Sequence, residues 1–177
     1  MKPDLDHWLP DATLRVVHRR ESTVSAEELW AAASAVRLSE TGLLGRLVRW
    51  RIPGLAPDER YNELFREPPF TMLHEGEHEL VSGLVGRIWT IRRDYPRLES
   101  PAAFENWAER GTARVVLASW AEDLGDGRSA LSSEARVQAL GTQGRIGVAA
   151  VRPVVRGFQN LVGTEGIAAA VRKAERE

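Results

Sequence analysis

Four histidines carry most of the potential for acid–base chemistry or metal binding, because the 177-residue chain contains no cysteine. His74 and His78 are four residues apart in a segment with strand-like alternation. A regular strand would hold them roughly 13 Å apart along its length, which is too far for two ligands of one metal ion. We therefore expect no metal site and no cofactor. The missing cysteines also exclude a disulfide framework and a thiolate nucleophile.

His18 is the histidine best placed for a binding role. It shares one face of a predicted strand with Leu14 and Val16. We expect that face to be the concave face of a sheet, where an imidazole supplies a polar anchor in a cavity. The simpler interpretation is a histidine whose hydrogen bonds are satisfied within the core, and both interpretations stay open.

A second group of candidates is charged. Glu134 and Arg136 share one face of a predicted strand, Arg114 lies on the neighbouring strand, and Arg87 can point to either side of its own strand. On the outer face of a sheet such residues form exposed ion pairs worth under about 1 kcal/mol, which is the default interpretation. On the inner face they would form a buried polar cluster and a functional candidate.

Large apolar side chains are the candidates for lining a cavity. The chain has six tryptophans, of which Trp107 and Trp120 lie on predicted strands. Val155, Phe158 and Val162 belong to the apolar stripe of a predicted C-terminal helix. We expect these five side chains to contact a ligand.

Charge and motif content exclude several classes of protein. The formal net charge of -1 provides no basic face, so we expect no nucleic-acid partner. The sequence has no GxxxxGK[ST] run, no dinucleotide-binding fingerprint at Gly83 and Gly86, and no Gly-x-Ser-x-Gly elbow. No apolar run reaches the roughly 18 residues of a transmembrane helix, and residues 1–11 are a lead-in arm rather than a signal peptide. We expect a soluble, cytoplasmic protein.

The elements that must position these residues follow from the hydrophobic period. Alternation predicts strands at 13–24, 70–77, 79–89, 104–108, 112–124 and 129–140. Two helices are predicted between the first two strands, at about 26–36 and 41–50, and the first begins with a Ser25–Glu28 capping box. We interpret the basic, aromatic face of the second helix as solvated, with a membrane-surface or partner patch as the alternative. That face comprises Arg46, Arg49, Trp50 and Arg51.

A long C-terminal helix is predicted at about 146–175. Its apolar stripe consists of Val148, Val151, Val155, Phe158 and Val162. Pro153 should start a new turn or kink this helix, and Gly157 and Gly163 should loosen it. These features make the helix a candidate movable lid.

Three stretches carry a resemblance to a known superfamily: Glu79–Trp89 (ELVSGLVGRIW), Leu131–Val137 (LSSEARV) and the helix entry Val151–Pro153. With the order of elements, they resemble the START-like (SRPBCC, polyketide cyclase/lipid-transport) superfamily, and within it a bacterial branch of uncharacterised proteins. The resemblance implies an α+β helix-grip fold, with residues 1–177 forming a single domain. In that fold a curved antiparallel sheet, here of six or seven strands, wraps on the long C-terminal helix around an apolar tunnel. The resemblance implies no catalytic residues.

We expect the chain to bind a small, largely apolar molecule in this cavity without catalysis. One alternative is an enzyme of the cyclase or dehydratase type that uses His18 or Glu134 as an acid or base. Another is a protein-interaction module with a vestigial cavity and an exposed apolar patch. The oligomeric state stays open at this stage.

Overall fold

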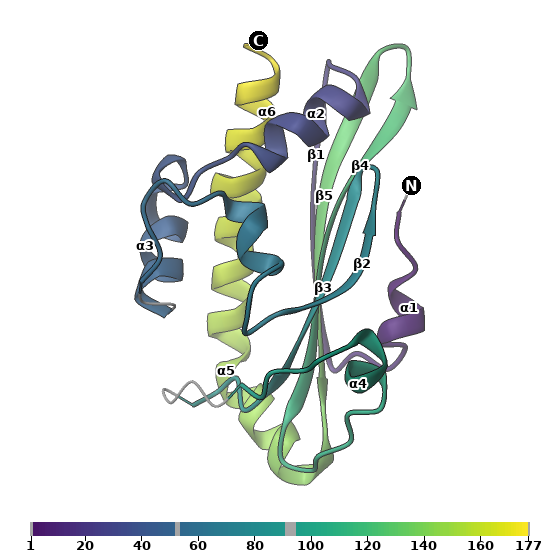
Figure 1. Cartoon of the computed structure of the whole chain (residues 1–177), viewed down its shortest axis with the longest axis vertical. Coiled ribbons are helices and arrows are strands. Elements are labelled where there is room, and N and C mark those ends of the chain that lie inside the picture. The colour runs from purple at the N-terminus through teal and green to yellow at the C-terminus, as the bar shows by residue number, and fades with distance from the viewer. Residues whose placement is uncertain (1, 52–53, 91–94, 177) are drawn as a thin grey trace.

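The computed structural model describes residues 2–51, 54–90 and 95–176. Their strands form one antiparallel sheet in the order β1-β5-β4-β3-β2 (Figure 1). The two edge strands are β1 (Leu14–Ser22) and β2 (Thr71–Gly76), and the three inner strands are β3 (Glu79–Gly86), β4 (Ala113–Gly125) and β5 (Arg128–Ala139). The sheet of the described residues thus has five strands, and the prediction of six or seven is wrong.

The long C-terminal helix lies along one face of this sheet (Figure 1). It consists of α5 (Gly141–Leu161), a π-helical segment η3 (Val162–Ile167) and α6 (Ala168–Ala174), which follow one another without interruption. The interruption expected at Pro153 is not observed, since α5 remains α-helical through this residue. Pro153 and Ala149 are both exposed, so water can satisfy the Ala149 carbonyl that Pro153 leaves without a donor. The irregular turn of the helix is η3 instead.

Two short helices separate β1 from β2, as predicted. They are α2 (Ala26–Ser34) and α3 (Gly42–Arg51), accompanied by the 3₁₀ segments η1 (Leu38–Glu40) and η2 (Tyr61–Phe65). The capping box of α2 is formed: Ser25 Oγ accepts from the Glu28 amide at 3.2 Å, and the Glu28 carboxylate accepts from the Ser25 amide at 3.0 Å. Side chains of α2, α3 and η2 pack with the long helix and the sheet in one core.

A second layer covers the opposite face of the sheet. It contains α1 (Leu5–Trp8), from the segment expected to be a lead-in arm, and α4 (Pro101–Glu105). The strand predicted at 104–108 is therefore wrong. Ser100 Oγ accepts from the Ala103 amide and Pro101 occupies the first turn, so local capping favours a helix over a strand here.

Phe104 anchors α4 to the sheet at a glycine. A Cβ atom on Gly83 would lie 2.7 Å from the Phe104 ring, so only glycine leaves room for this ring on β3. The β3–β4 register runs without a shift past Gly83. This glycine serves close packing rather than a bulge.

Candidate functional site

A row of four cross-strand neighbours crosses the helix-facing side of the sheet. His18 of β1 pairs with Ser133 of β5, Ser133 with Ser119 of β4, and Ser119 with Leu80 of β3. Residues directly opposite one another in adjacent strands share a face. The middle of the row is therefore polar, and its β3 end is apolar.

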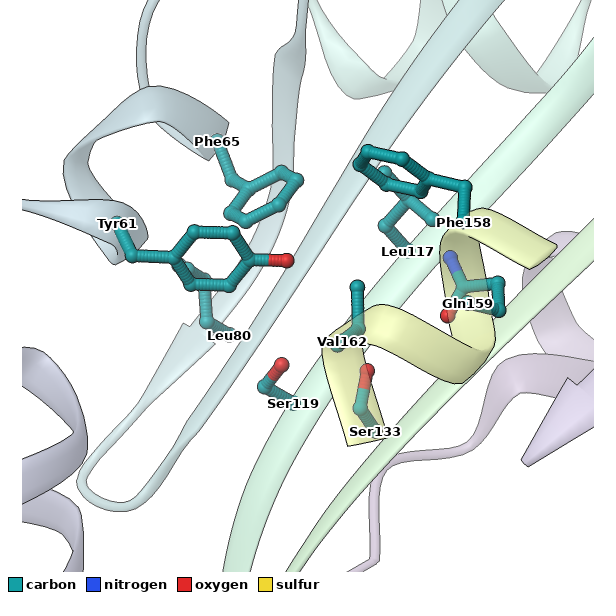
Figure 2. Close-up of a pocket in the computed structure, with 9 residues that line it drawn as sticks. All are labelled: Tyr61, Phe65, Leu80, Leu117, Ser119, Ser133, Phe158, Gln159 and Val162. Carbon is teal, nitrogen blue, oxygen red and sulfur yellow. The ribbon is translucent and has the colours of Figure 1, made fainter. Parts of the chain in front are cut away.

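The C-terminal helix lies over this row and closes a small pocket with η2 (Figure 2). The side chains that line the pocket are Tyr61, Phe65, Leu80, Leu117, Ser119, Ser133, Phe158, Gln159 and Val162. The rings of Tyr61 and Phe65 meet edge to face, with centroids 5.1 Å apart. Six of the nine lining side chains are aromatic or aliphatic and the other three are polar, a mixture that is typical of small-molecule sites.

The free volume is small. The space open to the centre of a water molecule is about 20 Å³ in this pocket and about 20 Å³ in a second one beside it. The second pocket extends toward Trp30 and Ile167 and shares Tyr61 and Val162 with the first. Each holds about one water molecule. The interior is therefore nearly filled by the protein's own side chains, and a larger guest requires the helix or η2 to move.

Two buried polar atoms at this level of the helix have no hydrogen-bond partner among the described residues. They are Gln159 Oε1 and His18 Nε2. Gln159 is 3% exposed, and the His18 ring lies against Gly163, one turn further along the helix. An unpaired buried polar atom costs about 1–3 kcal/mol. Gln159 Oε1 can accept a hydrogen bond from water or a ligand in the pocket, whereas His18 lines neither pocket and its Nε2 donates or accepts according to the tautomer of the ring.

The hydroxyl of Tyr61 points across the pocket toward the helix (Figure 2). Burial raises the pKa of this phenol well above its ordinary value of 10.0. Tyr61 is therefore neutral at physiological pH, and its hydroxyl can both donate and accept a hydrogen bond.

Of the three apolar candidates on the C-terminal helix, two line the pocket and one does not. Phe158 and Val162 line the pocket. Val155 packs instead against the neighbouring cluster around Leu14 and Val148.

The two tryptophans proposed for the cavity lie elsewhere. Trp120 is buried in the layer on the opposite face of the sheet, and Trp107 packs against that layer. Alternation along β4 puts Trp120 on the face opposite to Ser119. Residue 107 follows α4, and its indole donates to Thr112 Oγ1 at 3.0 Å. Neither side chain lines the pocket.

Glu134 and Arg136 also lie on the face away from the pocket, yet both are buried. Glu134 Oε1 accepts from Arg136 Nε at 2.6 Å and from Arg15 Nε at 2.7 Å. Arg136 Nη1 donates to Asp6 Oδ1 at 2.5 Å and to the Leu9 carbonyl at 3.1 Å. The N-terminal segment that contains α1 therefore covers the pair, and their charges hold this segment on the sheet. Glu134 does not reach the pocket.

Arg114 and Arg87 do not meet the pocket either. Arg114 donates to Gln138 Oε1 through Nε at 2.9 Å and to the Glu105 carbonyl through Nη1 at 2.9 Å. Its burial lowers the pKa of the guanidinium relative to a free arginine. Arg87 follows the end of β3 and is exposed.

The sequence prediction missed the residues that give the pocket its polarity. Ser133 alternates with the apolar residues Leu131 and Ala135 on one face of its strand. This alternation was the available signal for Ser133. Gln159 lies three residues before Val162 on the helix, so the same spacing that identified Val162 also indicates Gln159. Tyr61 comes from a proline-rich segment in which no periodic pattern exists, and only the folded chain places it.

Two further features were predicted to be absent, a metal site and a membrane-spanning helix. His74 Nε2 lies 2.7 Å from Glu79 Oε1. No group of three or more His, Cys, Asp or Glu side chains is close enough to hold a metal ion in the part of the chain that the structure describes. Over the same residues, no helix has the length and apolar character needed to cross a bilayer.

Comparisons with known proteins find distant structural similarity. The chain is similar to the Zhui aromatase/cyclase of Streptomyces sp. R1128, with 17% identity, 92% of this chain and 94% of that chain covered, and a TM-score of 0.37. It is similar to truncated norcoclaurine synthase of Thalictrum flavum, with 12% identity, coverage of 89% and 92%, and a TM-score of 0.44. A hypothetical protein of Helicobacter pylori gives 8% identity, coverage of 98% and 95%, and a TM-score of 0.43.

No protein-family model and no curated protein sequence matches the chain. The antiparallel sheet and the long C-terminal helix across it form the α+β helix-grip arrangement that the sequence predicted.

Proposed function

We propose that this chain binds a small, largely apolar molecule between the sheet and the C-terminal helix, without catalysing a reaction. The observation that carries the proposal is the unpaired Gln159 Oε1 in the wall of a pocket whose other lining side chains, apart from Ser119 and Ser133, are aromatic or aliphatic. A core shaped only for stability would place an apolar side chain at this position, because a buried acceptor without a partner is costly.

Entry of such a molecule requires the pocket to widen. Phe158 and Val162 line it from the helix side. Phe158 lies one turn before the π-helical segment, and Val162 is the first residue of that segment. π-Helical turns within α-helices are frequent at functional sites. Gly157 and Gly163 flank this stretch and lower its intrinsic helix stability by about 1 kcal/mol each relative to alanine. These features favour an opening of the helix between residues 157 and 167.

Binding of the neutral fluorescent probe N-phenyl-1-naphthylamine tests the proposal. Val162→Phe fills the space at a residue that lines both pockets, whereas Val154→Phe makes the same change on the same helix at a side chain that is 69% exposed. We expect Val162→Phe to reduce probe affinity at least about tenfold and Val154→Phe to leave it unchanged. Circular dichroism confirms that both variants are folded.

Native mass spectrometry of the purified chain supplies a second measurement. A bound molecule that is present with the parent protein and Val154→Phe but lost with Val162→Phe would support the proposal. Equal probe affinity in all three proteins would place binding outside the pocket and contradict it.

The enzyme alternative loses one of its two candidate groups. Glu134 is fully buried on the opposite face of the sheet between two arginines, so it cannot transfer protons in the pocket. His18 remains. It lines neither pocket but is the cross-strand neighbour of Ser133, which does, and its Nε2 is buried and unpaired within the described chain. Under this alternative, a His18→Gln variant would keep probe binding and lose turnover of a carbonyl substrate.

A protein-interaction role is the second candidate function. It is favoured by the small pocket volume and by two exposed apolar side chains two turns apart on α5, Ile146 at 67% and Val154 at 69%. Sedimentation velocity over a range of concentrations tests whether this surface pairs with a second copy of the chain. In that case Val154→Ser should abolish association and leave probe binding unchanged.

A further inference from the structure

The pocket has hydrogen-bonding capacity but no charge. Within the described residues, no Asp, Glu, Lys, Arg or His lines either of the two adjoining pockets. An ionised carboxylate or ammonium group moved from water into such a site would lose its hydration without gaining an opposite charge. The site therefore favours a neutral occupant over a fatty acid or an organic cation.

The unpaired buried atom in the pocket wall is an acceptor. It is the Gln159 side-chain oxygen, which can only accept hydrogen bonds. The hydroxyls of Ser119, Ser133 and Tyr61 can each donate or accept a hydrogen bond. Gln159 Oε1 thus lacks a hydrogen-bond donor, and a bound ligand must supply one.

Aromatic side chains stand on both sides of the pocket. Phe65 and Phe158 lie on either side of it in Figure 2, with Leu80 and Leu117 below them on the sheet. Aromatic rings pack well edge to face or offset against a further ring. The wall therefore suits the apolar body of a planar molecule, while its polar end lies toward Gln159.

We infer that the ligand is a neutral, hydroxylated aromatic molecule whose hydroxyl group donates a hydrogen bond to Gln159 Oε1. This inference rests on the proposed function and specifies its ligand class. Water competes for the same oxygen, because each pocket can hold about one water molecule. A ligand hydroxyl reproduces the hydrogen bond of that water, whereas a methyl ether displaces the water and leaves the oxygen unpaired.

Three probes that differ in one group test the inference: 2-naphthol, 2-methoxynaphthalene and 2-naphthoate. Calorimetry with the unaltered full chain should show 2-naphthol binding at least about tenfold more tightly than the methyl ether, and the carboxylate binding more weakly than both. This comparison needs no variant, so it is independent of any folding defect.

Gln159→Leu then identifies the acceptor. We expect its affinity for 2-naphthol to fall to within about twofold of its affinity for the ether, with binding of the ether retained. Gln143→Leu, the same change at an exposed position of α5, should keep the tenfold preference.

The possible failures are distinguishable. Equal binding of 2-naphthol and its ether, tightest binding of the carboxylate, or a preference that survives Gln159→Leu would overturn the inference while the binding function stands. Absence of binding by all three probes and by N-phenyl-1-naphthylamine would overturn both.

Discussion

The His18 ring occupies the space that a side chain at residue 163 would need. A Cβ atom on Gly163 would lie 2.6 Å from His18 Cγ, closer than packed atoms approach. The π-helical turn of the C-terminal helix therefore lies directly on the first strand at this point. The same contact holds the unpaired Nε2 of His18 under the helix, one turn from Gln159.

Gly163→Ala should move the helix away from β1. We expect a loss of about 1–3 kcal/mol in the free energy of unfolding, because the methyl group overpacks a filled interface. Gly157→Ala is the matched control, since no atom lies within 4 Å of its added methyl group. That control should be neutral or more stable by up to about 1 kcal/mol. Urea unfolding measures the free energy of unfolding of the two variants. Equal changes in this free energy would show that residue 163 tolerates a side chain.

Glu134 should contribute strongly to stability although it has no role at the pocket. Glu134→Gln removes the charge shared by Arg15 and Arg136, and we expect a loss of about 3 kcal/mol. Glu21→Gln removes an exposed partner of Arg19 and should cost less than about 1 kcal/mol. Thermal unfolding of the two variants measures the difference, and a Glu134→Gln protein as stable as its parent would contradict the buried network.

Asp6 should make docking of α1 sensitive to acid. The hydrogen bond and charge of Arg136 hold the pKa of Asp6 below its ordinary value of 3.8. A carboxylate whose pKa is lowered by folding contributes stability above its unfolded pKa, and this contribution is lost as the pH falls through the lower folded value. We expect amides of residues 5–9 to lose hydrogen-exchange protection below about pH 3.8, before the sheet does.

Asp6→Asn should weaken this protection already at pH 7, because the neutral amide loses the charge-assisted bond to Arg136. Asp11→Asn, at an exposed position after α1, is the control and should behave like the parent. Equal protection of residues 5–9 in all three proteins would show that apolar contacts alone hold α1.

Tyr61 should ionise only when the protein unfolds. Burial raises the pKa of this phenol, so the neutral form is favoured in the folded state. A raised folded pKa contributes stability that is fully present below the unfolded value of 10.0 and is lost as the pH rises toward the folded value. In a Tyr95→Phe protein Tyr61 is the only tyrosine, and its absorbance increase at 295 nm should coincide with the loss of the circular dichroism signal. Ionisation at lower pH in the folded protein would contradict the burial of its hydroxyl.

The sequence by itself determined the order and type of most elements. Alternation in β5 and the 3–4 spacing of Val148, Phe158 and Val162 are local patterns, because a strand or helix must present its apolar residues to one side. The Ser25–Glu28 capping box is likewise a local hydrogen-bonding arrangement. These signals were sufficient for the helix-grip arrangement of sheet and long helix. The roles predicted for Phe158, Val162 and His18 in contacting a ligand stay predictions.

Only the tertiary structure decided on which face of the sheet each polar side chain lies and which segment of the chain covers that side chain. Glu134 and Arg136 are buried because α1, more than a hundred residues away in sequence, docks over them. Tyr61 and Gln159 meet because an aperiodic segment and the last helix converge over β4 and β5. Such contacts depend on packing between distant segments, and hydrophobic periodicity reports only one segment at a time.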